Sequence, residues 1–305
     1  MKMENPFVSG VYTALVTPFT ANGDHVNLKI LERLIVRQAE AGVQGVVVLG
    51  TTGESPTVLD WERDNIIRCA VRVKKEQGLD LNIIAGCGTN STHKTFHYSH
   101  SAMQMGADGV LLVNPYYNKP SQEGLYQHFS HVAQRGLMPI MLYNIPGRTG
   151  VNLETETLIR LVKDCPSIYA IKEASGNEAH IRDVIEYSRR EREDFGVFSG
   201  DDAMTPFVLN NGGNGVVSVV SNVVPEDVAL QHRTYGCEVD EFHEVTLKLE
   251  PLISACFVEG NPSSVKYIVN RLGFDCGPMR LPLVTPGSAN QQKIDDVLRG
   301  YGLIQ

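Results

Sequence analysis

A lysine at the end of an apolar run is the first residue in this sequence whose position suggests chemistry. In YAIKEAS (169–175), apolar residues typical of a β-strand lead directly into Lys172. Burial disfavours a charged ammonium group and lowers its pKa. The amine therefore either reaches water at the rim of the protein or attacks a carbonyl group to form a Schiff base.

A second polar stretch, YNIPGRTG (143–150), also follows an apolar run. The phenol of Tyr143 could move protons near a Schiff base, and the guanidinium of Arg148 could bind a carboxylate through two hydrogen bonds. The Pro-Gly pair is a turn signal, and we include Gly147 of this turn among the substrate-binding candidates. The alternative is an ordinary turn with a surface arginine.

The stretch GTTGESPT (50–57) offers two hydroxyl groups between glycines, at Thr51 and Thr52. Hydroxyl groups and free backbone N–H groups in such a turn suit an anion. The plainer alternative is a loop that caps the following helix, and both interpretations can hold together. The candidate residues for that cap are Ser55, Thr57 and Asp60.

A fourth stretch, NPYYNKPSQEG (114–124), carries two adjacent tyrosines, Tyr116 and Tyr117, before an Asn-Lys-Pro turn. The loop is rich in hydrogen-bonding groups. An exposed pair of tyrosines is also what a protein interface uses.

Other signatures of enzyme sites are missing from the sequence. His93, His97 and His100 have helical spacing, but no HExxH motif accompanies them, and a histidine-lined helix surface is the favoured interpretation. Neither a GxSxG elbow nor a P-loop occurs. The nearest approach to a dinucleotide fingerprint, GCGTNS (86–91), lacks the third small residue at the required place.

Short apolar runs alternate with longer amphipathic stretches along most of the chain. Near-continuous Val, Ile and Leu are typical of parallel strands buried on both faces. Eight such units favour a (β/α)8 barrel over a doubly wound sheet, and in a barrel the carboxyl ends of the strands form the active site. The expected strands are 10–19, 45–50, 82–86, 109–113, 139–144, 169–175, 195–200 and 215–220.

The pattern becomes helical after residue 225. We expect a barrel over residues 1–228 and a helical region over 229–305, made of the last barrel helix and appended helices.

Composition limits the classes of function. The 305 residues have a net charge of −8, which argues against a nucleic-acid partner. The six cysteines are scattered without a CxxC motif, which favours a reducing compartment. No run of about 18 apolar residues predicts a membrane span. We therefore expect a soluble, cytoplasmic protein that contacts neither nucleic acid nor membrane.

These motifs together resemble one family. From about residue 8 to the C-terminus, the sequence is similar to the dihydrodipicolinate synthase and N-acetylneuraminate lyase family. The resemblance implies a class I aldolase on a (β/α)8 barrel that needs neither metal nor organic cofactor, because a lysine Schiff base with pyruvate serves as the electron sink. It is carried by GTTGE (50–54), PYYNKPSQEGLYQHF (115–129), YNIPGRTG (143–150), IKEASG (171–176), SGDD (199–202) and GVVSV (215–219).

The resemblance also implies roles for single residues. Lys172 matches the Schiff-base lysine and Tyr143 the tyrosine that moves protons to and from the imine. Thr51 and Tyr117 match the rest of a hydroxyl relay, in which Tyr117 is supplied by a neighbouring subunit. The expected substrate-binding residues are Thr52 for the pyruvate carboxylate, Arg148 for the second substrate, Gly147, and Val217, whose carbonyl faces the lysine.

Arg148 distinguishes the branches of this family. Sialic acid lyases resemble one another in an apolar residue there, whereas an arginine suits the carboxylate of aspartate semialdehyde. We therefore expect condensation of pyruvate with aspartate semialdehyde to 4-hydroxy-tetrahydrodipicolinate, in lysine and diaminopimelate biosynthesis. The alternatives are a lyase for a keto-acid sugar, such as N-acetylneuraminate or 2-keto-3-deoxygluconate, and a barrel without enzymatic activity. The resemblance implies a homo-oligomer, and we expect a tetramer built as a dimer of dimers.

Inhibition by lysine is a further property that the resemblance addresses. Ser55, Asn90 and Tyr116 fit the inhibitory site of lysine-sensitive members. However, Lys94 replaces a glutamate of those members, and Asp60 and Arg63 replace histidines. A cation at Lys94 should repel the ammonium group of the inhibitor, so we expect weak or no inhibition by lysine.

Overall fold

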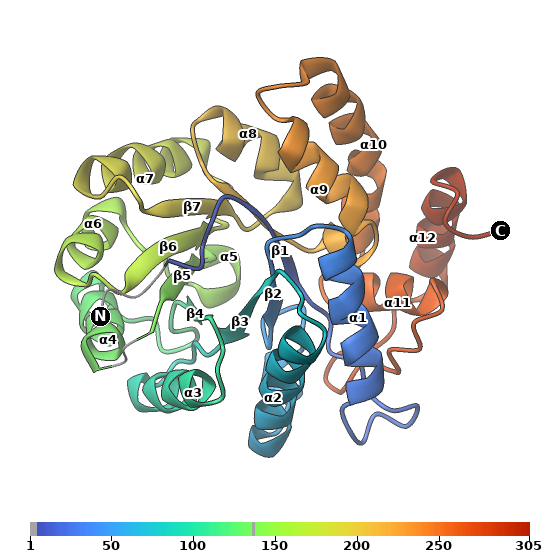
Figure 1. Cartoon of the computed structure of the whole chain (residues 1–305), viewed down its shortest axis with the longest axis horizontal. Coiled ribbons are helices and arrows are strands. Elements are labelled where there is room, and N and C mark those ends of the chain that lie inside the picture. The colour runs from blue at the N-terminus through green and yellow to red at the C-terminus, as the bar shows by residue number, and fades with distance from the viewer. Residues whose placement is uncertain (1–4, 136–137) are drawn as a thin grey trace. The chain divides into compact units, whose positions relative to one another are not determined.

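The structure is a computed structural model that describes residues 5–135 and 138–305. Its eight parallel strands form a closed barrel in the order β1 to β8, so the predicted (β/α)8 fold is confirmed (Figure 1). The strands are β1 (Gly10–Ala14), β2 (Gly45–Val48), β3 (Asn82–Gly86), β4 (Gly109–Val113), β5 (Ile140–Asn144), β6 (Ile168–Glu173), β7 (Gly196–Ser199) and β8 (Gly215–Ser218).

The chain divides into two compact units. The first comprises the residues up to 10 together with Asn82–Val217, and the second comprises Val11–Leu81 together with Ser218–Gln305. The predicted boundary between a barrel and a helical region at 228/229 falls inside helix α9 and stays a prediction. The helices are α1 (Leu28–Glu40), α2 (Asp60–Glu76), α3 (Thr92–Gln104), α4 (Gln122–Arg135), α5 (Pro146–Thr149), α6 (Thr155–Asp164), α7 (Glu178–Glu191), α8 (Thr205–Asn210), α9 (Pro225–Thr234), α10 (Val239–Phe257), α11 (Ser263–Arg271) and α12 (Ser288–Gly300).

In the first unit, β3 to β8 form a continuous run of paired parallel strands. Helices α3, α4, α6 and α7 pack against one another in that order along the outside of these strands (Figure 1). Nearly all strand residues are buried, because one face meets the barrel interior and the other meets the helices.

The pairing of β5 with β6 contains one irregularity. Ile140 pairs with Ile168, but Met141 pairs with Ala170, so Tyr169 is an extra residue in β6. From there the register continues without interruption to the pairs Tyr143–Lys172 and Asn144–Glu173. Such bulges occur near active sites, where they redirect side chains.

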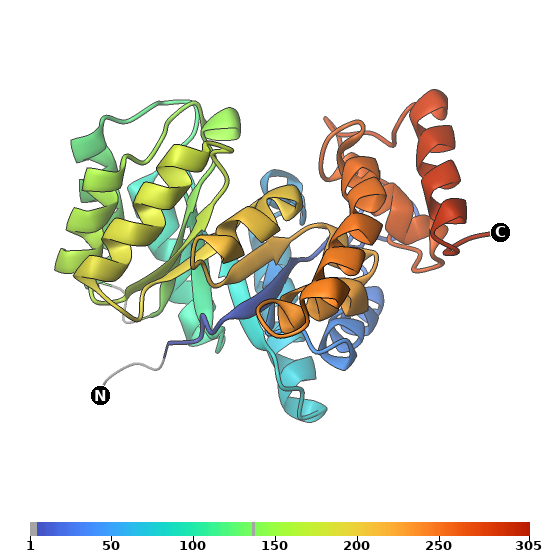
Figure 2. The ribbon, with the colours of Figure 1, turned by 90° about the horizontal axis from the view of Figure 1, so that it is seen from above.

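In the second unit, β1 pairs with β2, and α1 packs against α2. Helix α10 contacts α9, α11 and α12, which lie beside it in orange and red in Figure 2. The residues suggested by the alternative interpretation as caps of α2 do not cap it. The N-cap residue of this helix is Leu59, whose N–H group donates to the Glu62 carboxylate at 3.0 Å, instead of Ser55, Thr57 or Asp60.

Within residues 5–135 and 138–305, no helix combines the length and the apolar character that crossing a membrane requires.

Candidate active site

Lys172 is buried at the carboxyl end of β6, as the sequence predicts, with a side chain only 5% exposed. Its register partner on β5 is Tyr143, which is also 5% exposed. Paired residues of parallel strands direct their side chains to the same face. The amine nitrogen of Lys172 accordingly lies 4.3 Å from the centre of the Tyr143 ring.

The surroundings of Lys172 favour the neutral amine. The pKa of Lys172 is lowered from 10.5 to about 8, mainly by burial and in smaller part by the positive charge of Arg148. The carboxylates of Asp202 and Asp201 act in the opposite direction, but burial outweighs them. At pH 8 about half of such amines are unprotonated and ready to attack a carbonyl carbon.

Gly200, which directly follows β7, leaves room for the lysine side chain. A Cβ atom at Gly200 would lie 2.6 Å from Cβ of Ala174 and 3.0 Å from Cε of Lys172, closer than side chains approach one another. The N–H group of Gly200 donates to the carbonyl oxygen of Glu173 at 2.7 Å, which fixes this close approach. Gly200 therefore restricts where the Lys172 chain lies.

Arg148 and Gly147 are exposed on α5, a single helical turn that follows β5. The turn is stabilised internally, because the hydroxyl group of Thr149 donates to the carbonyl oxygens of Ile145 at 3.1 Å and Val151 at 2.9 Å. It ends at Gly150, which has a positive φ of 73°. We call residues 145–152 the arginine loop.

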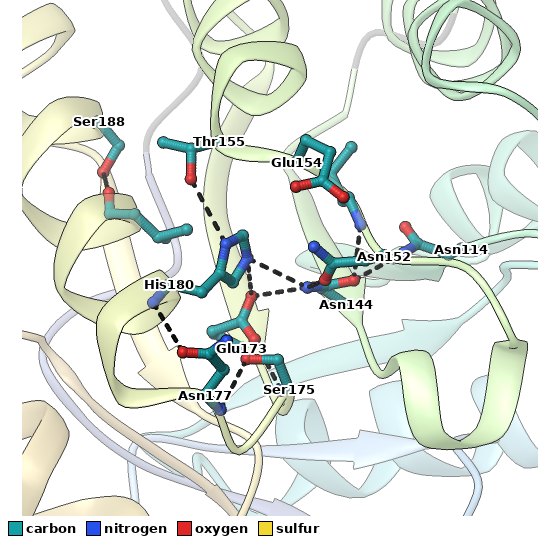
Figure 3. Close-up of polar contacts among 12 residues, drawn as sticks. Asn114, Asn144, Asn152, Glu154, Thr155, Glu173, Ser175, Asn177, His180 and Ser188 are labelled. Atoms are coloured by element: carbon teal, nitrogen blue, oxygen red, sulfur yellow. Dashed lines mark hydrogen bonds and ion pairs between the residues drawn. The ribbon is translucent and has the colours of Figure 1, made fainter.

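A buried amide joins both ends of the arginine loop (Figure 3). Asn144, the last residue of β5, donates from Nδ2 to Oδ1 of Asn152 at 2.8 Å and to Oε2 of Glu173 at 2.9 Å. Its Oδ1 accepts from the N–H group of Leu153 at 3.0 Å and from Nδ2 of Asn114 at 2.9 Å. All four hydrogen-bonding positions of the Asn144 side chain are therefore used.

Glu173 extends the same network toward α7. Its Oε1 accepts from the N–H group of Ser175 at 2.7 Å, and its Oε2 lies 3.5 Å from Nε2 of His180 (Figure 3). The hydroxyl group of Thr155 lies 3.4 Å from Nδ1 of the same ring. The hydrogen bond with Glu173 raises the pKa of His180, although burial opposes this. Because neighbouring strand residues face opposite sides, Asn144 and Glu173 lie behind Tyr143 and Lys172.

The second unit contains the predicted anion-binding turn. Thr52 is 2% exposed, and its Oγ1 accepts a hydrogen bond from Nδ2 of Asn261 at 3.0 Å. The carbonyl oxygen of Gly53 accepts from the Thr17 hydroxyl group at 2.6 Å. Thr51 lies beside them and is partly exposed. The relay predicted between Thr51 and Tyr143 stays a prediction.

A buried ion pair holds the end of this turn. Glu54 has a positive φ of 55°, and its Oε1 lies 2.7 Å from Nζ of Lys266, with both side chains almost fully buried. The backbone N–H group of Arg280 donates to Oε2 of Glu54 at 3.0 Å. The Arg280 guanidinium in turn binds both oxygens of Glu62, at 2.6 and 2.7 Å. Glu54 is therefore fully paired in its strained backbone conformation.

Tyr117, Val217 and the three histidines complete the residues singled out in the sequence. Tyr117 is 90% exposed and has a positive φ of 72°, so its phenol is not packed against its own chain. Val217 is fully buried in β8. The histidines His93, His97 and His100 lie on α3 as expected, and the described residues contain no cluster of three or more side chains arranged for a metal.

Sequence reasoning missed Gly200 and the network behind the lysine. For Gly200 the available signal was the SGDD motif, which follows directly on a strand-like run. Asn144 and Glu173 each follow a predicted catalytic residue, so their polarity at the end of an apolar run was a signal of the same kind. Nothing in the sequence indicated their partners Asn152 and His180.

A closed parallel barrel with a buried, partly neutral amine at the end of its sixth strand defines a (β/α)8-barrel enzyme. Comparison with known proteins agrees. The sequence model of the Dihydrodipicolinate synthetase family matches residues 7–300. The 4-hydroxy-tetrahydrodipicolinate synthase of Thermotoga neapolitana is 43% identical over 296 residues, which cover 97% of this chain and 99% of that protein.

Solved structures are equally similar. The crystal structure of dihydrodipicolinate synthase from Thermotoga maritima has a TM-score of 0.93 and 43% identity, and the match covers 97% of this chain and 99% of that one. The enzyme from Cyanidioschyzon merolae, solved with lysine bound, has a TM-score of 0.93 and 38% identity, covering 99% of this chain and 100% of that one. The chain therefore belongs to the dihydrodipicolinate synthase family.

Proposed function

We propose that this enzyme condenses pyruvate with aspartate semialdehyde to give 4-hydroxy-tetrahydrodipicolinate, a step in lysine and diaminopimelate biosynthesis. The observation that carries the proposal is the buried Lys172 amine, with a pKa lowered to about 8, against the ring of its register partner Tyr143. A partly neutral amine beside a phenol suits imine formation and proton transfer. The names of the 43% identical relatives support the same reaction.

The proposed reaction begins when the Lys172 amine attacks the ketone carbon of pyruvate and water leaves, which gives an imine. Tyr143, linked to Thr51 and to Tyr117 of a neighbouring subunit, removes a methyl proton and gives the enamine. The enamine carbon then attacks the aldehyde carbon of aspartate semialdehyde. The amino group of the condensed product displaces the lysine nitrogen, so the product cyclises and the amine is regenerated. The protonated imine accepts the electron pair, so no metal or organic cofactor takes part.

Substrate binding is assigned to residues near these groups. Thr52 holds the pyruvate carboxylate, and the backbone carbonyl of Val217 faces the lysine. On the arginine loop, the guanidinium of Arg148 binds the carboxylate of aspartate semialdehyde, and Gly147 is a further substrate-binding residue. The exposure of Arg148 on a single helical turn suits a group that meets an entering substrate.

A homo-oligomer, a tetramer built as a dimer of dimers, is part of the proposal. Its support is Tyr117, a large aromatic side chain that is 90% exposed on a backbone with φ of 72°. An exposed tyrosine suits insertion into another subunit. Sedimentation analysis of the wild type and Tyr117→Phe tests this, since the variant should keep the oligomer and lose activity.

The cytoplasm is the proposed location. All six cysteines are free thiols, and five of them are buried, which suits a reducing compartment.

Lysine is proposed to inhibit weakly or not at all. Two of the replaced positions carry cations: the guanidinium of Arg63 donates to the Ser55 hydroxyl group at 2.9 Å, and Lys94 is exposed on α3. Asp60 is exposed at the start of α2. An inhibition curve with lysine tests this. Half-inhibition below about 1 mM, which corresponds to a binding free energy of roughly 4 kcal/mol, would refute it.

Assays with alternative substrates test the main proposal. Pyruvate and aspartate semialdehyde should give the cyclic product, whereas N-acetylneuraminate and 2-keto-3-deoxygluconate should not be cleaved. Borohydride with pyruvate should add mass at Lys172 and at no other residue. Cleavage of a sugar acid without condensation would keep the imine chemistry but overturn the assignment of Arg148.

A further inference from the structure

The arginine loop is held by groups that do not themselves face the lysine. Tyr143 and Lys172 share one face of the β5–β6 pair, and the next residues, Asn144 and Glu173, share the other. Both Asn144 and Glu173 are at most 1% exposed. Their hydrogen bond therefore joins the carboxyl ends of the two strands in a dry environment, where such contacts are strong.

Both ends of the arginine loop are attached to Asn144. The loop starts after Asn144 and ends at Asn152 and Leu153, and both of these bind the Asn144 side chain, at 2.8 and 3.0 Å. Nε2 of Gln122, on α4, donates a hydrogen bond to the Asn152 carbonyl oxygen at 2.8 Å. The exit of the loop is therefore fixed relative to β5, whereas Arg148 at its middle is exposed.

We propose that Asn144, Glu173 and Asn152 are positioning residues that hold the arginine loop for the second, carboxylate-bearing substrate. This inference rests on the proposed function. Glu173 orients the Asn144 amide, since its carboxylate accepts one of the two Nδ2 protons and Asn152 accepts the other. With its amide fixed in this way, Asn144 presents its Oδ1 to the N–H group of Leu153 and closes the loop. A loose loop would bind aspartate semialdehyde less tightly and leave pyruvate capture by Lys172 intact.

Asn152 is the most informative residue to change, because it is partly exposed and belongs to neither of the two strands that carry Tyr143 and Lys172. Asn152→Ala removes the acceptor for Asn144. We expect the KM for aspartate semialdehyde to rise about three- to tenfold, the loss for one hydrogen bond. In the same variant, the KM for pyruvate and the rate of borohydride labelling should stay within about twofold of their wild-type values.

Two further variants separate positioning from general damage to the fold. Asn152→Asp keeps an acceptor oxygen and should restore the KM for aspartate semialdehyde. Glu173→Gln leaves only one acceptor for the two donors of Asn144 and Ser175, so it should raise the same KM. Its matched control is Glu178→Gln, the same change at an exposed carboxylate of α7 that pairs with Arg182.

The outcomes distinguish this inference from the proposed function. Unlabelled Lys172 in the wild type would mean that the proposed reaction is wrong. Normal labelling and condensation, with a wild-type KM for aspartate semialdehyde in Asn152→Ala and Glu173→Gln, would overturn only the positioning role. A rise of both KM values in proportion to a lower Tm, not reversed in Asn152→Asp, would overturn it as well.

Discussion

Tyr143 and Lys172 are register partners on β5 and β6, and the lysine nitrogen lies 4.3 Å from the centre of the tyrosine ring. The face of a tyrosine ring attracts a cation by about 0.5–2 kcal/mol, which favours the ammonium form. Burial nevertheless lowers the pKa of Lys172 to about 8, so the cost of removing the charge from water is larger than this attraction. The same neighbour can therefore contact the amine without fixing it in its protonated state.

The pH dependence of imine formation follows from this pKa. Because only the neutral amine attacks pyruvate, the rate of borohydride labelling should rise with pH and level off above about pH 8. An unperturbed lysine would show the rise near pH 10.5. Labelling should be measured from about pH 6 to about pH 11, in steps of roughly half a pH unit. A rise centred near pH 10.5 would contradict the prediction.

Replacing the buried amine should stabilise the protein. The pKa of Lys172 is lower in the folded chain than in the unfolded chain, so the unfolded state binds its proton more tightly. The contribution of Lys172 to stability should therefore be least favourable below pH 8 and improve between pH 8 and 10.5. At neutral pH, Lys172→Met should raise the free energy of unfolding by roughly 3 kcal/mol and abolish activity.

Urea unfolding at pH 7 and pH 10 checks this result. The variant should lack the rise in stability between these two pH values, whereas the wild type shows it. Equal pH dependence in both proteins would mean that Lys172 is not the group responsible.

Removal of the Tyr143 hydroxyl group should slow proton transfer selectively. Tyr143→Phe keeps the ring against Lys172 but has no proton to exchange. Exchange of pyruvate methyl protons for deuterium, followed by NMR, should fall by about 10²- to 10⁴-fold. Retention of wild-type exchange in this variant would show that another group moves the proton.

Gly200→Ala should displace the lysine side chain. The added Cβ would approach Cβ of Ala174 to 2.6 Å and Cε of Lys172 to 3.0 Å. We expect labelling by pyruvate and borohydride to slow by at least about tenfold, since near-attack geometry is lost. Gly300→Ala, at the exposed end of α12, is the comparison, because no atom outside the backbone of its own helix lies within 4 Å of a Cβ at that position. Equal labelling rates in the two variants would contradict the steric argument.

Lys266→Met should destabilise the second unit strongly. It leaves the carboxylate of Glu54 buried without its cation, a change that costs about 3–5 kcal/mol. Lys248→Met is the matched control, since Lys248 is half exposed and pairs with Asp227 at the surface, where a pair contributes less than about 1 kcal/mol. Chemical denaturation of both variants gives the comparison, and similar losses would contradict it.

Much of the architecture could be predicted, because parallel strands buried on both faces produce a plain signal. The expected runs 82–86 and 109–113 coincide with β3 and β4. Lys172 and Tyr143 could be assigned to neighbouring strand ends for the same reason. The ends of other strands were predicted too long, as in 10–19 against Gly10–Ala14, because apolar residues continue into buried loops.

The parts that could not be predicted depend on contacts between distant residues. Lys266 follows a pattern typical of a solvated helix position, yet it is buried because Glu54, more than two hundred residues away in the chain, is its partner. Helical spacing cannot indicate such a pair. His180 likewise reads as a surface residue until α7 brings it near Glu173.

The extra residue Tyr169 in β6 shifts the pairing of every later residue of this strand by one position. If the register between Ile140 and Ile168 continued unshifted, Tyr143 would face Ile171, and Lys172 would face Asn144. The amine would then change places with an apolar side chain and point to the opposite surface of the strand. Which residue pairs with Tyr143 therefore depends on the number of residues in β6 as well as on their types. Deletion of one residue at Tyr169 would turn the Lys172 side chain to the other face of the strand without changing the side chain itself.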